Sequence, residues 1–110
     1  PADTHIDFSR GASRIVNLVR ALSPEPGAVC LDSQGSRLKV FRASLGTGQW
    51  PGTKPGTVVS VGKDSFEIVA GDGGTLIVHE VQPEGRRVMS ASDYLAGHRM
   101  EVGEKFVQIE

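Results

Sequence analysis

The chain has 110 residues and a formal net charge of -1, with 38% hydrophobic and 23% charged residues. This length suits one domain with one core, and the composition excludes a wholly disordered chain. No apolar run approaches the ~20 residues that span a bilayer, and the first residues, PADTHIDFSR, lack the layout of a secretory signal. We therefore expect a single soluble domain over residues 1–110, located in the cytoplasm.

The first predicted element is a helix near residues 9–22. Apolar residues recur there at helical spacing, and arginines occupy the polar side. Ser9 is the predicted N-cap, because its hydroxyl can accept a hydrogen bond from a free amide of the first turn. The two prolines and the glycine of SPEPGA, residues 23–28, predict the end of the helix and a fixed angle against the strand that follows.

Short β-type stretches separated by turn sequences follow the helix. In the second of them, Leu38, Val40 and Leu45 are expected to face inward, with basic residues on the opposite side. A bulge after Val40 would bring Arg42 to that outer side. The predicted strands are 28–32, 37–45, 57–62, 65–70, 75–82 and 105–109.

A second, shorter helix is predicted at SASDYLAGH. Ser90 and Asp93 form a capping pair at its start, and Gly97 is a suitable stop. The order of elements predicts a mainly β chain with two short helices, arranged as a small, partly open β-barrel.

The segment GTGQWPGTKPG, residues 46–56, has no regular periodicity and reads as a long loop. It contains the single tryptophan of the chain. We expect Trp50 to pack against Pro51 and Pro55; stacking on a base or ribose is the alternative.

Charge is unevenly distributed along the chain. Residues 1–32 hold three arginines against four acids, residues 33–63 hold five basic residues and no acid, and residues 64–110 hold four basic residues against nine acids. The local balances are therefore -1, +5 and -5. An acid-free basic segment favours a polyanionic partner, although solvated side chains on exposed strand faces are the simpler interpretation.

No catalytic or metal-binding motif stands out. The residues GTVVSVGK, 56–63, lack the spacing of a phosphate-binding loop, and Asp64 stands where that loop needs Ser or Thr. The three histidines are dispersed without metal-ligand spacing, and Cys30 reads as a small core residue. A self-contained active site is not expected.

Two groups of residues together resemble the C-terminal domain of methionyl-tRNA formyltransferases. The first is RALSPEPGA, residues 20–28, and the second is QPEGRRVMSASDYLAG, residues 82–97. The segments RLKVFRA and PGTVVSV lie between them in the same order as in that family, and the resemblance covers nearly the whole chain.

The resemblance implies a fold and a division of labour. The fold would be a small OB-like, Greek-key β-barrel whose family role is to hold tRNA. Family members carry their catalytic residues in an N-terminal domain that uses 10-formyltetrahydrofolate to formylate initiator Met-tRNA. The resemblance thus implies no cofactor and no catalytic residue in this chain, with that N-terminal domain and the tRNA as partners, and neither a membrane nor a metal.

The resemblance also suggests which cations would contact tRNA phosphates. We rank three groups of candidates. The cations of the basic middle segment, residues 33–63, come first, the basic pair that follows Gly85 comes second, and two arginines one helical turn apart in the first helix come third. In that order the candidates are Arg37, Lys39, Arg42, Lys54, Lys63, Arg86, Arg87, Arg10 and Arg14.

Two other interpretations stay open. One is the C-terminal barrel of a related formyl-transferring enzyme that acts on a small molecule, such as an amino-sugar formyltransferase or 10-formyltetrahydrofolate dehydrogenase, where it would shape the active site without touching RNA. The basic pair Arg86 and Arg87 favours the tRNA branch over this one. The third interpretation is a scaffold that serves folding or dimerisation and binds no ligand.

Overall fold

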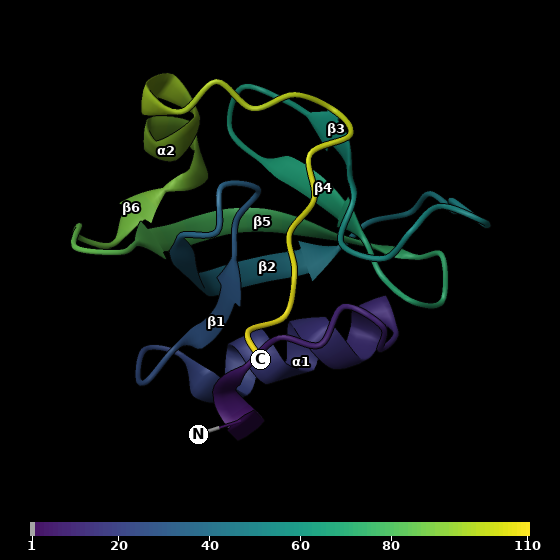
Figure 1. The fold of residues 1–110 in the computed structure, drawn as a ribbon, viewed down its shortest axis with the longest axis horizontal. Coiled ribbons are helices and arrows are strands. Elements are labelled where there is room, and N and C mark those ends of the chain that lie inside the picture. The colour runs from purple at the N-terminus through teal and green to yellow at the C-terminus, as the bar shows by residue number, and fades with distance from the viewer. Residues whose placement is uncertain (1) are drawn as a thin grey trace.

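The computed structural model describes residues 2–110 and contains one sheet flanked by two helices (Figure 1). The prediction of a mainly β chain with two short helices is confirmed. In chain order the elements are the 3-10 helix η1 (Ala2–Thr4), α1 (Ala12–Leu22), β1 (Ala28–Leu31), β2 (Arg37–Leu45), β3 (Val58–Val61), β4 (Phe66–Val69), β5 (Thr75–Pro83), β6 (Met89–Ser90) and α2 (Ala91–Gly97).

The sheet is antiparallel with the order β1-β2-β5-β4-β3, and β6 pairs with β5. Strands β3, β4 and β5 follow one another as hairpins, and β2 returns by the long loop to lie beside β5, which is the predicted Greek-key order. The sheet remains open, because β1 and β3 are not paired with each other. The bulge predicted after Val40 is present as a register shift that places Arg42 opposite Glu80.

The core lies between the curved sheet, α1 and α2. Figure 1 shows α1 beneath β2 and α2 on the opposite side, above β5. The apolar face of α1 is buried at Ala12, Ile15, Val16 and Val19, as its periodicity predicted. Strand β2 alternates as expected for a half-buried strand, with Leu38 and Val40 buried; Leu45, however, is 51% exposed, so its inward assignment was wrong.

The start of α1 differs from the prediction. The helix begins at Ala12 with Gly11 as N-cap, and no side chain of its own segment caps it. The Ser9 hydroxyl instead donates to Asp7 Oδ1 at 2.6 Å. Asp72, in the turn between β4 and β5, accepts from the Ala12 amide at 3.2 Å. A distant carboxylate thus takes the place of the predicted local cap.

The corner after α1 ties the helix to the sheet. Both Ser23-Pro24 and Glu25-Pro26 are cis peptide bonds, and Gly27 has a φ of 87°. The Ser23 hydroxyl lies 2.9 Å from the Val19 carbonyl oxygen and 2.6 Å from the Phe41 carbonyl oxygen. A Cβ at Gly27 would lie 2.9 Å from the Phe41 ring. The corner therefore fixes the end of α1 against β2, one strand beyond the adjacent β1.

The predicted last strand, 105–109, is not a strand. Residues of this segment form isolated bridges, Leu31 with Val107 and Thr57 with Lys105. Val107 exchanges backbone hydrogen bonds of 2.9 and 3.0 Å with Leu31, whereas the Phe106 amide donates to Gly56 at 2.8 Å. Because neighbouring residues bond to opposite edges of the sheet, no continuous ladder forms. The segment spans the opening between β1 and β3 instead.

The segment after α2 contains a partly buried carboxylate, Glu104. Its Oε1 accepts from the Ser33 hydroxyl at 3.0 Å and lies 3.6 Å from His98 Nε2, and its Oε2 accepts from the Glu101 amide at 2.9 Å. Burial alone would raise the pKa of Glu104, but these hydrogen bonds and His98 outweigh it and hold the pKa below its ordinary value.

We expect Glu104→Gln to change how stability depends on pH. A lowered carboxyl pKa stabilises the fold above the unfolded-state value, and this stabilisation is lost as the pH falls through the folded-state value. Urea unfolding between about pH 7 and about pH 3, a range that covers carboxyl titration, should show the variant less stable at neutral pH and the difference disappearing in acid. Glu110→Gln, at an exposed side chain, is the control. A difference that stays constant across this range would contradict the assignment.

None of the three helices in residues 2–110 has the length and apolar character of a membrane-spanning segment.

Candidate nucleic-acid interface

The candidate cations are almost entirely free of carboxylate partners. Among residues 2–110, only Arg10 of the nine has a carboxylate within 4.0 Å, at 3.5 Å between its Nε and Asp7 Oδ2. A phosphate could therefore approach the others without displacing an existing ion pair. Their positions in space, however, differ from their order along the chain.

Antiparallel pairing brings five of the nine to one part of the molecule. In the register of β2 and β5, Lys39 lies opposite Gln82, and the Gln82 side-chain amide donates from Nε2 to the Arg86 carbonyl oxygen at 2.8 Å. The Glu84 amide donates to the Arg37 carbonyl oxygen at 3.1 Å, so the start of β2 lies against the β5–β6 connection. We call this group the β2–β5 cluster; its members are Arg37, Lys39, Arg42, Arg86 and Arg87.

The β2–β5 cluster also contains acids. Glu80 lies opposite Arg42 in the register, and Glu84 Oε1 accepts a long 3.4 Å hydrogen bond from the Arg37 amide. Among residues 2–110 neither carboxylate has a cationic group within 4.0 Å, so these residues keep a balance of five cations against two acids. This surface can attract a polyanion, although less strongly than an acid-free surface.

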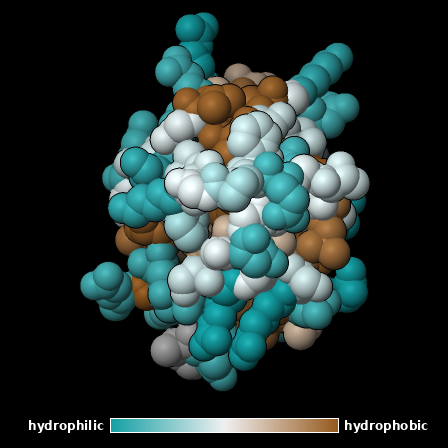
Figure 2. Space-filling model, turned by 90° about the vertical axis from the view of Figure 1, so that its right-hand side faces the viewer, coloured by the Kyte–Doolittle hydropathy of each residue, from teal (hydrophilic) through white to brown (hydrophobic). Residues whose placement is uncertain are grey.

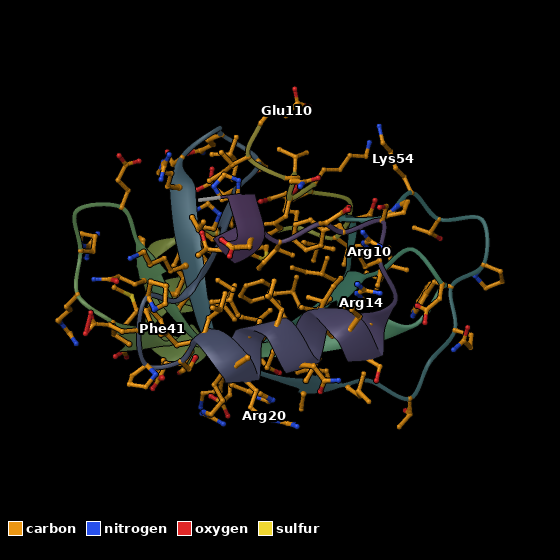
Figure 3. All side chains as sticks on the ribbon, turned by 90° about the horizontal axis from the view of Figure 1, so that it is seen from below. Arg10, Arg14, Arg20, Phe41, Lys54 and Glu110 are labelled. Carbon is orange, nitrogen blue, oxygen red and sulfur yellow. The ribbon has the colours of Figure 1, made fainter. Side chains whose placement is uncertain are left out.

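Arg10 and Arg14 lie in a different place. They line a groove of about 610 Å³ between the N-terminal segment, α1 and Gln108, together with Asp3, His5 and Asp7. In Figure 3 both arginines lie beside the N-terminal half of α1, whereas Arg20 lies on the other side of the helix. The two acids in this groove make it a mixed-charge surface.

The remaining two candidates are separated from the β2–β5 cluster and from each other. Lys54 lines a hollow formed by the long β2–β3 loop and the β4–β5 turn. Lys63 lines a groove of about 390 Å³ beside α2. The five cations of the basic middle segment therefore do not form one surface, because the two loops carry Lys54 and Lys63 away from β2.

Two further cations are brought next to candidates. Arg99 lines the same groove as Lys63, and Arg20 lines a small pocket of about 120 Å³ with Arg42. Arg20 continues the polar stripe of α1, which is a signal in the sequence. Arg99 belongs to the acidic third of the chain, so charge counts gave no signal for it. It lies near Lys63 only because of the way α2 packs.

The described residues contain no recognisable catalytic centre. Ser44 Oγ and His79 Nε2 form a 2.8 Å hydrogen bond. The pKa of His79 is lowered, mainly because the ring is partly buried and also because the positive charge of Arg42 is nearby. Within residues 2–110 no hydrogen bond or ion pair orients the other ring nitrogen of His79, so a triad is incomplete. Cys30 is fully buried, as predicted, and burial raises the pKa of its thiol. Within residues 2–110 no group of three or more metal-ligating side chains is present.

The sequence and the fold both have known relatives. Residues 1–99 match the family model described as formyl transferase, C-terminal domain. The chain is 45% identical over 107 residues to a methionyl-tRNA formyltransferase of Symbiobacterium thermophilum, covering 96% of this chain and 32% of that protein. It is 40% identical over 103 residues to the methionyl-tRNA formyltransferase of Lysinibacillus sphaericus, covering 92% and 32% of the two chains.

A solved structure shares the fold. HypX from Aquifex aeolicus, crystallised in complex with tetrahydrofolic acid, superposes with a TM-score of 0.69 at 19% identity, covering 84% of this chain and 16% of that one. The present chain thus spans about a third of the length of the methionyl-tRNA formyltransferases it matches, at 32% in both. On the family match over residues 1–99, the chain belongs to the formyl transferase C-terminal domain family.

Proposed function

We propose that this chain is the tRNA-contacting domain of a methionyl-tRNA formyltransferase. It would position initiator Met-tRNA while a separate N-terminal domain transfers the formyl group from 10-formyltetrahydrofolate, as a cytoplasmic step of translation initiation. Identities of 40–45% to methionyl-tRNA formyltransferases support this proposal. The observation that carries it is the β2–β5 cluster, whose cations have no carboxylate partner within 4.0 Å in the part of the chain that the structure describes.

The physical basis is neutralisation of phosphates. Each Lys or Arg that contacts a phosphate releases condensed counterions, so affinity falls as salt rises. Such contacts orient a nucleic acid without reading its bases. This suits a domain whose task is to hold tRNA while chemistry takes place elsewhere. We expect weak binding by the chain alone, since the remaining contacts would come from the N-terminal domain.

A second candidate is the barrel of a small-molecule formyltransferase, which would shape an active site and bind no RNA. The two acids of the β2–β5 cluster favour it, because they weaken the attraction of this surface for a polyanion. The two candidates differ in one measurable property, which is the affinity for tRNA at low salt.

We expect the triple variant Arg37→Ala/Lys39→Ala/Arg42→Ala to bind initiator tRNA more weakly and with less dependence on salt. The slope of log affinity against log salt should become shallower by roughly 2 to 3, at 0.7 to 0.9 per lost phosphate contact. A fluorescence titration with labelled tRNA at several salt concentrations measures both quantities.

The control is Lys105→Ala, which removes a charge from the exposed C-terminal segment beside Thr57. It should leave the slope unchanged. Absence of tRNA binding at low salt would favour the small-molecule candidate. An unaltered slope in the triple variant would show that the β2–β5 cluster is not the contact surface.

A further inference from the structure

The long loop between β2 and β3 encloses a hollow that holds the only tryptophan of the chain. The hollow has a volume of about 470 Å³, and its lining includes Trp50, Pro51, Lys54, Pro55, Asp72 and Gly73. Trp50 is 40% exposed, although it lies beside the prolines against which it was expected to pack. A hollow of this size accommodates a single nucleotide, and part of the indole ring remains available to it.

Backbone hydrogen bonds hold the loop at several points. The Trp50 amide donates to the Gly73 carbonyl oxygen at 2.8 Å, and the Trp50 carbonyl oxygen accepts from the Thr53 amide at 3.3 Å. The Thr57 hydroxyl donates to the Lys54 carbonyl oxygen at 2.6 Å. The backbone that carries the indole and the ammonium is therefore fixed before any ligand arrives. Such preorganisation reduces the entropy lost on binding.

The hollow combines a free cation with an acid that is already engaged. Lys54 has no carboxylate within 4.0 Å among residues 2–110. Asp72 Oδ1 accepts from the Ala12 amide at 3.2 Å and from the Gly74 amide at 3.0 Å, so this carboxylate serves the helix start and its own turn. The lining therefore offers a ligand both an aromatic side chain and a positively charged one.

The surrounding surface is not an apolar docking face. Figure 2 looks at the end of the molecule that carries this loop and shows mostly pale and teal residues there, with brown surface confined to separate patches. This end therefore lacks the large continuous apolar patch that marks an obligate protein–protein interface. An aromatic ring beside a lysine is instead the usual means of holding a nucleotide, with the ring stacked on the base and the cation near the phosphate.

We propose that the hollow binds one unpaired nucleotide of an RNA, with Trp50 stacked on its base and Lys54 beside its phosphate. This inference rests on the proposed function and deepens it. Contacts to phosphates alone would not require an exposed indole ring, whereas stacking on a base would. A base inside a duplex cannot present its face to Trp50. The site therefore distinguishes single-stranded from double-stranded RNA, independently of base identity.

The test uses the intrinsic fluorescence of Trp50, which is unambiguous because the chain has one tryptophan. A single-stranded oligoribonucleotide of about ten residues, within the usual site sizes, should quench the emission, and a duplex of the same length should not. Trp50→Ala should weaken single-strand binding by roughly 5- to 100-fold, measured by anisotropy of a labelled oligonucleotide, and Trp50→Phe should weaken it less.

Further variants separate stacking from charge and from loss of fold. Lys54→Gln should make the salt slope shallower by about 1, whereas Trp50→Ala should leave the slope unchanged. Val102→Ala, at a side chain that is 64% exposed, is the control and should bind like the parent chain. Thermal unfolding followed by circular dichroism should show the same midpoint for all of these proteins.

The two proposals fail in different ways. Binding of tRNA with normal salt dependence, but with unchanged Trp50 fluorescence and undiminished affinity in Trp50→Ala, would overturn the hollow alone. Equal quenching by duplex and single strand would also overturn it. Absence of any RNA binding at low salt would overturn both proposals.

Discussion

Replacing Phe66 with alanine should lower the free energy of unfolding by about 3–5 kcal/mol, the range for deleting a large aromatic side chain from a packed core. Phe66 on β4 is 1% exposed. Its ring lies 5.8 Å from that of Phe106 in a stacked arrangement and 6.1 Å from that of Tyr94 in a tilted one. The side chain therefore joins the sheet to α2 and to the C-terminal segment, and its loss leaves a cavity that three elements line.

Urea or thermal unfolding measures the effect. A loss of this size lowers the melting temperature of a domain of about 100 residues by roughly 12 to 25 °C. Val102→Ala, at an exposed position in the same C-terminal region, should change stability by less than about 0.5 kcal/mol. A loss below about 1 kcal/mol for Phe66→Ala would mean that the core collapses onto the vacated space, and that this ring cluster does not unite the three elements.

Gly71→Ala should also destabilise the chain strongly, for a backbone reason. A Cβ at Gly71 would collide with the Ser9 carbonyl oxygen and lie 3.0 Å from Ser9 Cα. The Gly71 amide also donates to the Arg10 carbonyl oxygen at 2.9 Å, so the two backbone segments are held in contact. Neither can move away without losing that bond and the Asp72 cap on Ala12. We expect a loss of about 2–4 kcal/mol, at or above the range of roughly 1–3 kcal/mol typical of overpacking, because the added Cβ meets backbone rather than a movable side chain.

Gly97→Ala is the matched comparison for Gly71→Ala. Gly97 is the last residue of α2, and a Cβ there meets nothing within 4 Å. Alanine is the better helix former, so this variant should equal the parent chain or exceed it by up to about 1 kcal/mol. Similar effects of the two substitutions, measured by denaturant unfolding, would show that the contact between Gly71 and Ser9 is not the cause.

Local sequence signals predicted local structure well. The alternation around Leu38 and Val40 located β2 at residues 37–45, where the structure has it. Ser90 accepts from the Asp93 amide at 3.1 Å as a helix cap, as the sequence predicted. In these cases the residues that decide the structure lie within a few positions of one another.

The wrong predictions concern interactions between distant residues. Ser9 was expected to cap α1, but Asp7 engages its hydroxyl and Asp72, 60 positions from Ala12, takes over the cap. The alternation that buries Leu38 and Val40 was extended to Leu45, the last residue of β2, which pairs with the buried Leu76 and is nevertheless 51% exposed. No pattern within one segment contains this information.

The same distinction applies to the candidate interface. Charge counts along the chain found the cations of β2, and the family resemblance added Arg86 and Arg87. Only the register of β2 with β5 shows that these two groups are neighbours. Lys54 and Lys63 belong to the same basic segment, yet the course of two loops separates them from it. The number of charges in a segment of sequence contains no information about strand register or about the course of a loop.

The C-terminal segment that crosses between β1 and β3 has a consequence for how molecules of this chain meet one another. An open sheet presents unpaired amides and carbonyls at its outer strands, where a second chain could add itself. Here both backbone groups of Leu31 are bonded to Val107. At the other margin, the Val58 amide and carbonyl are bonded to Glu104 and Gly103. The segment thus occupies backbone groups at both margins of a sheet that does not close on itself, and we expect it to hinder the addition of strands from other molecules.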